Sequence, residues 1–337
     1  MENNIDVVIY WVDGADPEWR QSYKKYHGTN PGRFRDLGTL KYVLRGIQYN
    51  LPWVRYIHFV TNGQLPSWLN INHPKIKFHT HEDIFLFKDS LPVFNSSAIE
   101  INFSNIKGLS EKFILFNDDM LVLNYLPEER FFIKNLPVDY LKLSYPRKGL
   151  LYKKIKPQNY LASRFINNAY NFIKNKSIKS INKNSLFNKN YIKKTNFNNL
   201  IFSIFKEVYW IDIYHHPQPH LKSTWDKFIQ ENKNGIIKKT IHSKFRAPSD
   251  INQYIFRFIN LLNNDFYPQQ YMDNLSIYVR DINKFINKGV TPFNYSLLCI
   301  CEDESISDSE FNILKDYLTC RLNEKLPYKS DFEFSEL

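Results

Sequence analysis

The chain has 337 residues, of which 43% are hydrophobic, and a formal net charge of +11 at pH 7. This length and apolar content exclude a globally disordered chain and predict one large domain or a core with an inserted lobe. The basic balance favours anionic partners: nucleotides, nucleic acid, phosphorylated glycans or a membrane face. No signal peptide is apparent at the start, and no run reaches the ~20 apolar residues of a membrane span. We expect a cytoplasmic protein that can contact the cytoplasmic membrane peripherally.

The first third of the chain alternates predicted strands with predicted helices. Short β-branched and aromatic runs that end in turn residues predict four strands, over Ile5–Trp11, Tyr56–Thr61, Ile76–His79 and Phe113–Phe116. Helical spacing predicts helices over Leu40–Tyr49 and Asn95–Phe103, the second with Asn95 or Ser96 as its N-cap. Strands separated by helices predict an α/β fold with a mainly parallel, Rossmann-like (GT-A-like) sheet flanked by helices.

Polar residues follow three of these strands, namely Asp13, Asn62 and the run Asn117-Asp118-Asp119. Because ligands of open α/β sheets bind beyond the carboxyl ends of the strands, we expect a nucleotide-sugar site at this edge. Asp118 and Asp119 can hold a divalent cation against a diphosphate, and a turn or capping role is the alternative. The aromatic start Tyr10-Trp11, with Asp13-Gly14, could stack on a uracil ring and hold its edge or ribose, although core packing explains Trp11 equally well.

The composition changes between Tyr140 and Lys206, where lysine and asparagine are abundant and neither Asp nor Glu occurs. We interpret residues 140–206 as a basic, mostly helical insert between two parts of the core, 1–139 and 207–337. The insert is either a solvated basic face or an electrostatic platform for an anionic polymer or membrane. Nucleic acid is disfavoured as a partner, because no recognised nucleic-acid motif accompanies the charge.

After the insert the predicted elements resume and complete the core. Strands are predicted over Tyr209–Tyr214 and Ser296–Ile300. Helices are predicted over Ser223–Gln230, over about 251–262 and over Glu310–Asn323. The middle helix is expected to have Ser249 or Asp250 as its N-cap.

Two polar features of this third part could carry chemistry. Three histidines surround two prolines in His215–His220, which predicts a rigid loop with an imidazole available as a general base. Arg246 precedes a predicted helix and can clamp a phosphate, its alternative being a surface ion pair. The cysteines are three in number and lack a second Cys/His pair at ligand spacing, so we expect reduced core thiols and no zinc site. They are Cys299, Cys301 and Cys320.

Four blocks of sequence carry a family resemblance. The first is Ile5–Gly14, the third joins His215–Pro219 with Arg246 and Asp250, and the fourth is the strand that ends at Asp303. The second block spans most of residues 33–119 and comprises Arg33–Asp36, Leu44-Arg45, Pro52–Arg55, Val60–Gln64, Pro66–Asn70, Thr80–Phe85, Leu91-Pro92, Phe94–Ser96, Ala98–Glu100, Gly108–Ser110 and Phe116–Asp119. Together these blocks resemble the Stealth family of hexose-1-phosphate phosphotransferases. That family includes bacterial capsule enzymes and the animal GlcNAc-1-phosphotransferase that tags lysosomal enzymes.

The resemblance implies a reaction and a set of roles. The donor would be a UDP-hexose or UDP-N-acetylhexosamine, and a hydroxyl of a capsular or other surface polysaccharide would attack its β-phosphorus, form a phosphodiester and release UMP. Asp119 and Asp303, with Asp118 nearby, would hold Mg²⁺ or Mn²⁺. Arg246 would clamp the phosphoryl charge, and His215 would act as base or orienting group. The expected donor contacts are Trp11, Asp13, Gly14, Arg45, Asn62 and Asn117.

Two departures from the family pattern affect these assignments. The family usually has Asn before the fourth-block Asp, whereas this chain has Glu302, and the doubled His215-His216 leaves two alignments of the histidine motif. A metal-dependent glycosyltransferase that releases UDP would use the same donor and the same acidic strand end. A non-catalytic glycan- or membrane-binding protein could use the basic insert, but it would not need polar motifs at several strand ends.

Overall fold

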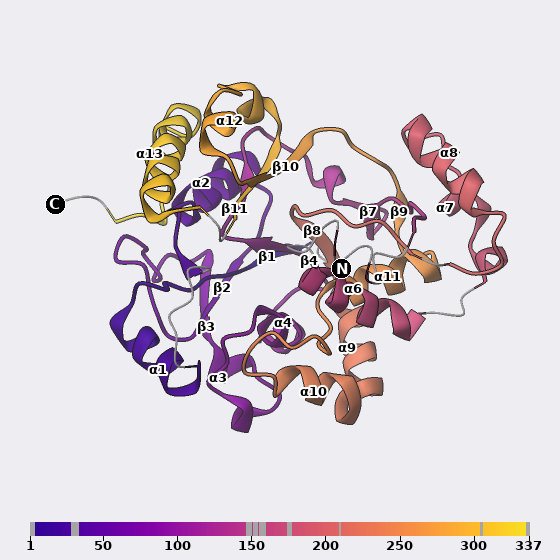
Figure 1. Cartoon of the computed structure of the whole chain (residues 1–337), viewed down its shortest axis with the longest axis horizontal. Helices are drawn as coiled ribbons and strands as arrows, with labels where there is room; N and C mark the ends of the chain where they lie inside the picture. Colours follow the sequence, from indigo (N-terminus) through magenta and orange to yellow (C-terminus); the bar gives the residue numbers. More distant parts are fainter. Residues whose placement is uncertain are drawn as a thin grey trace.

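The computed structural model describes residues 4–27, 34–145, 150, 154, 160–173, 177–208, 210–303 and 306–334. Its centre is a five-stranded sheet in the order β3-β2-β1-β4-β8 (Figure 1). The first four strands run parallel, and β8 runs antiparallel to β4. Their bounds are β1 Ile5–Tyr10, β2 Ile57–Thr61, β3 Ile76–Thr80, β4 Lys112–Asn117 and β8 Gln218–Leu221. The predicted α/β class with a mainly parallel sheet is confirmed.

Two smaller sheets adjoin the central one. The first has the order β10-β11-β5, with β11 parallel to β10 and antiparallel to β5. The second has the order β6-β7-β9. The bounds are β5 Met120–Val122, β6 Phe132–Ile133, β7 Leu136–Asp139, β9 Tyr267–Pro268, β10 Asn274–Val279 and β11 Leu297–Glu302. Since β5 follows β4 almost at once, the chain passes from the central sheet to the second sheet within the turn at Asp118 and Asp119.

Side-chain alternation along the central strands divides the core into two layers. Val7 and Ile9 of β1 face one layer, which α2, α12 and α13 help to form. Val8 of β1, with Phe113 and Leu115 of β4, faces the other layer, to which α4, α9 and α11 contribute. Both faces of the sheet are therefore covered by helices. Parallel sheets need this cover because the side chains on both faces of their strands are mainly apolar.

The helices occupy these bounds: α1 Pro17–His27, α2 Leu40–Asn50, α3 His81–Ile84, α4 Ser96–Glu100, α6 Tyr160–Ile173, α7 Lys183–Leu186, α8 Lys193–Phe202, α9 Lys222–Asn232, α10 Lys238–Ile241, α11 Tyr254–Asn263, α12 Ile282–Ile286 and α13 Asp308–Lys325. Asn95 caps α4 as predicted, because its side chain accepts a hydrogen bond from the amide of Ser97. Most of the predicted insert between residues 146 and 159, and residues 174–176, lie outside the described residues.

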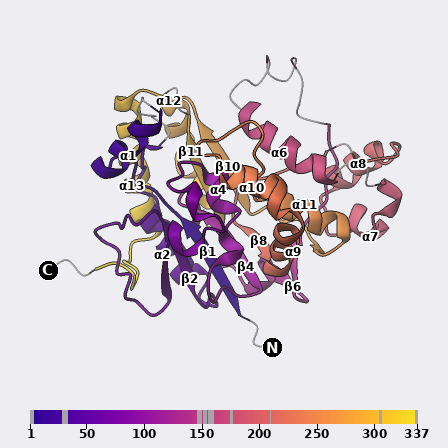
Figure 2. The ribbon, with the colours of Figure 1, turned by 90° about the horizontal axis from the view of Figure 1, so that it is seen from below.

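The described part of the insert is helical. Helix α6 packs against α11, where Asn168 donates to the carbonyls of Pro248 and Asp250 at 2.7 and 2.8 Å. Helices α7 and α8 lie at one end of the molecule, opposite α1 and α13 (Figures 1 and 2). The insert thus joins the core through α6 and extends from it through α7 and α8. No helix of the described residues is long and apolar enough to cross a membrane.

Three local predictions are wrong. Tyr209 is outside the described residues, and the rest of the predicted strand up to Tyr214 forms a single bridge, between Ile211 and Leu143, because its partner segment runs beside it only briefly. Helix α11 begins at Tyr254, since the Asp250 carboxylate is bonded to Ser243 and to earlier backbone instead of capping it. His220 belongs to strand β8 and not to a loop.

Candidate active site

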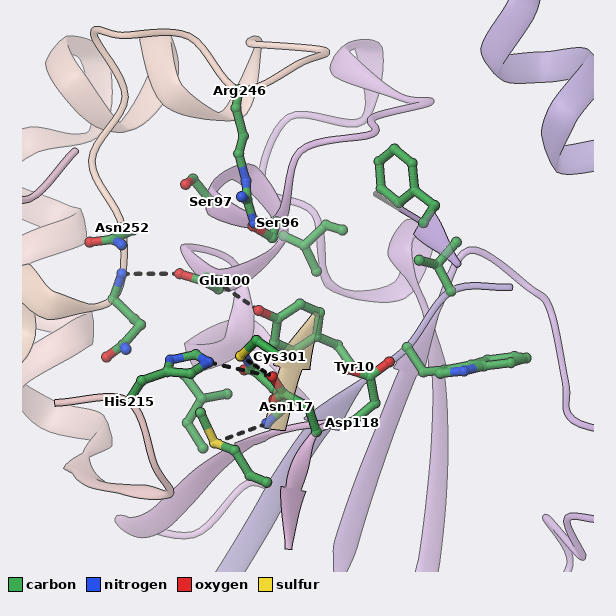
Figure 3. Close-up of a pocket in the computed structure, with 18 of the residues that line it drawn as sticks. Tyr10, Ser96, Ser97, Glu100, Asn117, Asp118, His215, Arg246, Asn252 and Cys301 are labelled. Atoms are coloured by element: carbon green, nitrogen blue, oxygen red, sulfur yellow. Dashed lines mark hydrogen bonds and ion pairs between the residues drawn. The ribbon is translucent and has the colours of Figure 1, made fainter. Parts of the chain in front are cut away.

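A cavity of about 610 Å³ opens at the carboxyl ends of β1 and β4, a size typical of sites for nucleotide-sized ligands (Figure 3). The central sheet contributes the residues at its strand ends, and later segments contribute the opposite side. Its polar and aromatic lining includes Tyr10, Trp11, Asp36, Asn62, Glu100, Asn117, Asp118, Asp119, His215, His216, Arg246, Cys301 and Glu302. The cavity therefore lies at the edge of the sheet where the sequence predicts a ligand site.

The acidic turn after β4 forms one side of the cavity. Thr39 donates from its hydroxyl to the carbonyl of Asp118 at 2.7 Å, which fixes the turn to the start of α2. Burial and the neighbouring charges of Asp119 and Asp36 raise the pKa of Asp118 well above its ordinary value. Burial would also raise the pKa of Asp119, but the hydrogen bond and charge of His215, together with hydrogen bonds from Cys301 and Cys299, outweigh it and lower that pKa. The two adjacent carboxyls thus have opposite tendencies to ionise.

His215 lies beside Asp119, and its neighbour His216 does not. The Nε2 atom of His215 is 3.6 Å from Oδ2 of Asp119, and the histidine side chain is 39% exposed. Desolvation acts to lower the pKa of His215, but Asp119 and Cys301 raise it well above the ordinary value. The Ser276 hydroxyl of β10 donates to the His215 carbonyl and holds this segment in place.

The ring of His216 has a different environment. It stacks on Tyr214 with centroids 4.0 Å apart and an interplanar angle of 11°. Burial lowers the pKa of His216 well below its ordinary value, so this imidazole is neutral at pH 7. Both histidines line the cavity, but only His215 contacts the acidic turn. The geometry therefore favours His215 as the functional histidine.

Arg246 approaches the cavity from the segment between α10 and α11 (Figure 3). Its Nη2 donates to the hydroxyl of Ser96 at 2.6 Å, and its Nε donates to the same oxygen at 3.2 Å. The segment is anchored by the buried carboxylate of Asp250, which accepts hydrogen bonds from Asn95, Ser243 and the amide of Ala247. An exposed guanidinium on an anchored loop is suited to clamp an anion that enters the cavity.

A buried pair lies below Arg246. The hydroxyl of Tyr10 donates to Oε1 of Glu100 at 2.9 Å, and the amide of Gln253 donates to Oε2 at 3.2 Å. Burial raises the pKa of Glu100, and the charges of Arg246 and His215 partly oppose that rise. The sequence indicates Tyr10 only as part of an aromatic start that could stack on uracil and does not indicate Glu100, although both fall within the blocks that carry the family resemblance.

Two family models match the N-terminal part of this chain. Residues 3–31 match the family model described as Stealth protein CR1, conserved region 1, and residues 33–138 match Stealth protein CR2, conserved region 2. The capsular polysaccharide phosphotransferase WcwK of Streptococcus pneumoniae is 34% identical, over 99% of this chain and 100% of its own length. The chain belongs to the Stealth family.

A second curated relative is similar along nearly its whole length. The exopolysaccharide phosphotransferase cps2G of Lactiplantibacillus plantarum is 30% identical, over 98% of this chain and 96% of its own length. Among solved structures, the galactosyltransferase LgtC aligns with 93% of this chain and 96% of its own at 12% identity, with a TM-score of 0.33 that is too low to establish a common fold. The predicted family and the predicted class of enzyme, a phosphotransferase, are confirmed by the sequence relatives.

Among the predicted site residues of this Stealth protein, Arg45 lies outside the cavity. Its Nε and Nη2 donate to the two carboxylate oxygens of Glu333, each at 2.7 Å, and Nη1 donates to the carbonyl of Leu326 at 3.0 Å. The Arg45 side chain is only 6% exposed. The structure therefore does not bring Arg45 to the cavity, because this arginine joins α2 to the C-terminal segment.

Asp303, a predicted metal ligand, also lies outside the cavity. Its Oδ2 accepts a hydrogen bond from Nε of Arg280 at 3.0 Å. The strand β11 instead presents Cys301 and Glu302 to the cavity. Burial raises the pKa of Glu302, and the charges of Asp119 and Asp36 raise it further. The carboxylate that β11 contributes is therefore that of Glu302, the residue where the sequence departs from the family pattern.

Asp13 and Gly14 shape the wall of the site without lining it. The Oδ1 of Asp13 accepts a hydrogen bond from the amide of Ala15 at 2.7 Å, and the Asp13 backbone is bonded to Gln64. A Cβ on Gly14 would lie 2.2 Å from the carbonyl oxygen of Phe34, so only glycine fits this close approach. The structure thus gives these two positions structural contacts next to the cavity and does not bring them into its lining.

The three cysteines differ in exposure. Cys299 is buried and Cys301 is half-buried beside the acidic turn, whereas Cys320 on α13 is exposed. The expectation of three core thiols is wrong for Cys320, since the solvent-facing side of an amphipathic helix carries it.

Proposed function

We propose that this enzyme transfers a hexose-1-phosphate, or an N-acetylhexosamine-1-phosphate, from a UDP-sugar to a hydroxyl of a capsular or other surface polysaccharide. One observation carries the proposal. Asp119, His215 and Arg246 lie far apart in the sequence, yet they surround one cavity at the carboxyl ends of parallel strands. The similarity to polysaccharide phosphotransferases along the whole chain supports the same reaction class.

The donor nucleotide would occupy the apolar side of the cavity. Trp11 is 8% exposed and stacks on Phe59, so it packs in the core and lines the cavity at once. Its indole Nε1 is buried and has no hydrogen-bond partner among the described residues. A ligand acceptor could satisfy this donor, and the amides of Asn62 and Asn117 stand at the same sheet edge.

The donor diphosphate would meet the charged part of the cavity. Asp119, with Asp118 and Glu302 nearby, offers the carboxylate oxygens that Mg²⁺ and Mn²⁺ prefer, and Oδ1 of Asp119 is buried without a hydrogen-bond partner in the described chain. A bound divalent cation would neutralise the diphosphate charge. Arg246 would bind the phosphoryl oxygens and stabilise the charge that builds on phosphorus.

His215 would act on the acceptor. The acceptor hydroxyl attacks the β-phosphorus, the bridging phosphorus–oxygen bond to UMP breaks, and the bond at the anomeric carbon stays intact. His215 lies at the acidic turn with its imidazole partly exposed to the cavity, a position from which it can orient the hydroxyl or take its proton.

The nucleotide product tests the proposal directly. Purified enzyme is incubated with a panel of UDP-sugars, Mg²⁺ and oligosaccharide acceptors, and the nucleotides are separated. Acceptor-dependent UMP is the expected product, and the donor that yields it identifies the sugar. Release of UDP instead would mean that the glycosidic bond breaks, which would replace phosphotransfer by glycosyl transfer.

We also propose that α8 and the segment after it place the enzyme on the cytoplasmic membrane. Phe197, Leu200 and Ile204 are 65%, 58% and 77% exposed, an unusual concentration of apolar surface for one short stretch. Lys193 and Lys194 are exposed beside them. Apolar side chains flanked by lysines match an anionic lipid surface, where each basic residue contributes about 1 kcal/mol.

Vesicle sedimentation distinguishes this from a merely solvated face. The wild-type enzyme should sediment with vesicles that contain anionic lipid and not with neutral ones. Phe197→Asp and Ile204→Asp should weaken sedimentation, whereas Tyr328→Asp should not. Tyr328 is an exposed aromatic residue in the segment that follows α13, and α13 lies at the opposite end of the molecule from α8 (Figure 1). Equal sedimentation of all three variants would contradict the proposed surface.

A further inference from the structure

Four potential metal ligands meet beside the cavity, although the sequence indicates no zinc site. They are Asp119 after β4, His215 before β8, and Cys299 and Cys301 on β11, and their ligand atoms all lie within 4.8 Å of one another. The Cys301 thiol donates to Oδ2 of Asp119 at 2.9 Å, and the two cysteine Sγ atoms are 3.7 Å apart. In Figure 3, His215 and Cys301 approach the same point from different elements.

The topology explains this convergence. Cys299 pairs with Met120 in the antiparallel ladder of β11 and β5, and β5 begins directly after Asp119. Because side chains two residues apart on a strand share a face, Cys301 projects on the same side as Cys299 and reaches the acidic turn. The hydroxyl of Ser276 on the neighbouring strand β10 holds the His215 backbone. Sequence spacing cannot show this cluster, since three separate segments supply it.

We propose that this cluster is a site for Zn²⁺. Two zinc-bound sulfurs at the usual bond length of about 2.3 Å and tetrahedral angle lie about 3.8 Å apart. The observed separation of the Cys299 and Cys301 sulfurs is 3.7 Å. Two sulfurs, one imidazole and one carboxylate form a set that selects zinc over magnesium, because thiolates bind soft cations.

A second observation points to a ligand at this place. The Oδ1 atom of Asp119 is buried and has no hydrogen-bond partner among the described residues. A buried carboxylate oxygen without a donor is costly, and a cation next to Asp119 would satisfy it. On binding, the two thiols would lose their protons to solvent and His215 would bind through its neutral form.

Zinc at this site would inhibit the transferase, a consequence that rests on the proposed function. Four protein ligands complete a tetrahedral shell and leave no position for substrate, which is typical of closed sites and not of catalytic ones. The shell would include Asp119 and His215, the residues assigned to the diphosphate cation and the acceptor hydroxyl. Zinc would therefore compete with the active arrangement of the same two side chains.

Cobalt binding tests the site without reference to activity. Titration of the full chain with Co²⁺ should produce the near-ultraviolet absorption of a sulfur-to-cobalt bond. Cys299→Ala and Cys301→Ser should remove this absorption and weaken Zn²⁺ binding at least about tenfold, the loss caused even by outer-shell changes. Cys320→Ser is the matched control and should behave as wild type, since Cys320 is exposed on α13. Circular dichroism checks that each variant is folded.

A second measurement tests the consequence. With Mg²⁺ and UDP-sugar present, Zn²⁺ should abolish UMP release by the wild type, and a chelator followed by Mg²⁺ should restore it. Inhibition, expressed relative to each variant's own zinc-free rate, should be much weaker for Cys301→Ser than for Cys320→Ser. Absence of the cobalt–sulfur absorption would overturn the site, and unchanged transfer with zinc bound would overturn the inhibition. If the protein shows the cobalt–sulfur absorption but releases no UMP, the metal site would be supported and the proposed transferase function would be wrong.

Discussion

Buried charges are arranged differently in the cavity and in the contact between α2 and the C-terminal segment. In that contact, Arg45 and Glu333 are each 6% exposed and form two parallel hydrogen bonds of 2.7 Å. In the cavity, His215 is 3.6 Å from Asp119, one oxygen of Asp119 has no partner in the described chain, and like charges help to raise the pKa of Asp118. The Arg45–Glu333 contact therefore has all its charges paired within the protein, whereas the carboxyl groups of the cavity do not.

This difference separates stability from function. A buried ion pair with full hydrogen bonding needs no further ligand, and Arg257 with Asp139 repeats that pattern elsewhere. The cavity instead holds neighbouring carboxyl groups whose hydrogen-bonding capacity is not filled by the protein. Such groups are typical of functional sites, where a ligand or cation supplies the missing interactions. Mutations at Arg246, Arg45 and His215 test whether the two regions differ as described, and a mutation at buried His220 adds a group that burial keeps neutral; they follow in order of expected effect.

Arg246→Ala should reduce the rate of UMP release about 10³-fold or more, because an arginine that stabilises phosphoryl charge contributes about 10³–10⁵ in rate. Arg246→Lys should recover only part of this, since a lysine lacks the planar fork of donors. Steady-state kinetics with a UDP-sugar and acceptor measure both variants. A rate within about tenfold of wild type for Arg246→Ala would remove the clamp from the mechanism.

Arg45→Ala should lower the free energy of unfolding by about 3–5 kcal/mol, because Glu333 would keep its burial and lose its partner. Turnover per folded molecule should stay unchanged. Denaturant unfolding measures the loss, and the double variant Arg45→Ala/Glu333→Ala should lose less than the two single variants together. Unchanged stability with lost turnover would restore the donor-binding role expected from the family resemblance.

His215→Gln should reduce turnover about 10²-fold, the lower end of what general acid–base groups contribute. His216→Gln is the matched comparison, since its ring stacks on Tyr214 away from the acidic turn, and it should have a much smaller effect. Turnover at saturating donor and acceptor distinguishes the two histidines. The reverse order would transfer the assigned role to His216.

His220→Phe should make the free energy of unfolding depend less on pH below about pH 6.5. Burial between Phe113 and Trp225 lowers the pKa of His220 to about 3, whereas the unfolded chain titrates near about 6.5. Between these values the unfolded state binds the proton and the folded state does not, so stability falls as the pH decreases. Unfolding at about pH 7.5 and about pH 5 should differ less in the variant than in the wild type. An identical difference would mean that other groups, such as His79 and His81, dominate.

The N-terminal sheet could be predicted closely from the sequence. Strands β1, β2 and β4 are almost entirely buried and β3 is mostly half-buried, and each of the four starts and ends within a residue of its predicted bounds. Parallel strands share one carboxyl edge, so Asn62, Asn117, Asp118 and Asp119 had to lie near one another. By contrast, the segment before His215 has a strand-like composition but forms only one bridge, between Ile211 and Leu143. Composition does not show over how many residues two segments pair.

Sequence and tertiary structure therefore determined different things about this protein. Periodicity and turn residues determined the fold class, and motif similarity determined the family, because both are written in local order along the chain. Only the tertiary structure decided that Arg45 pairs with Glu333, that Glu302 replaces Asp303 at the cavity, and that Cys301 meets His215 and Asp119. These contacts join residues far apart in the chain: Arg45 and Glu333 are 288 positions apart, and Cys301 and Asp119 are 182 positions apart. The burial that decides whether a charge is paired or available exists only once the chain has folded.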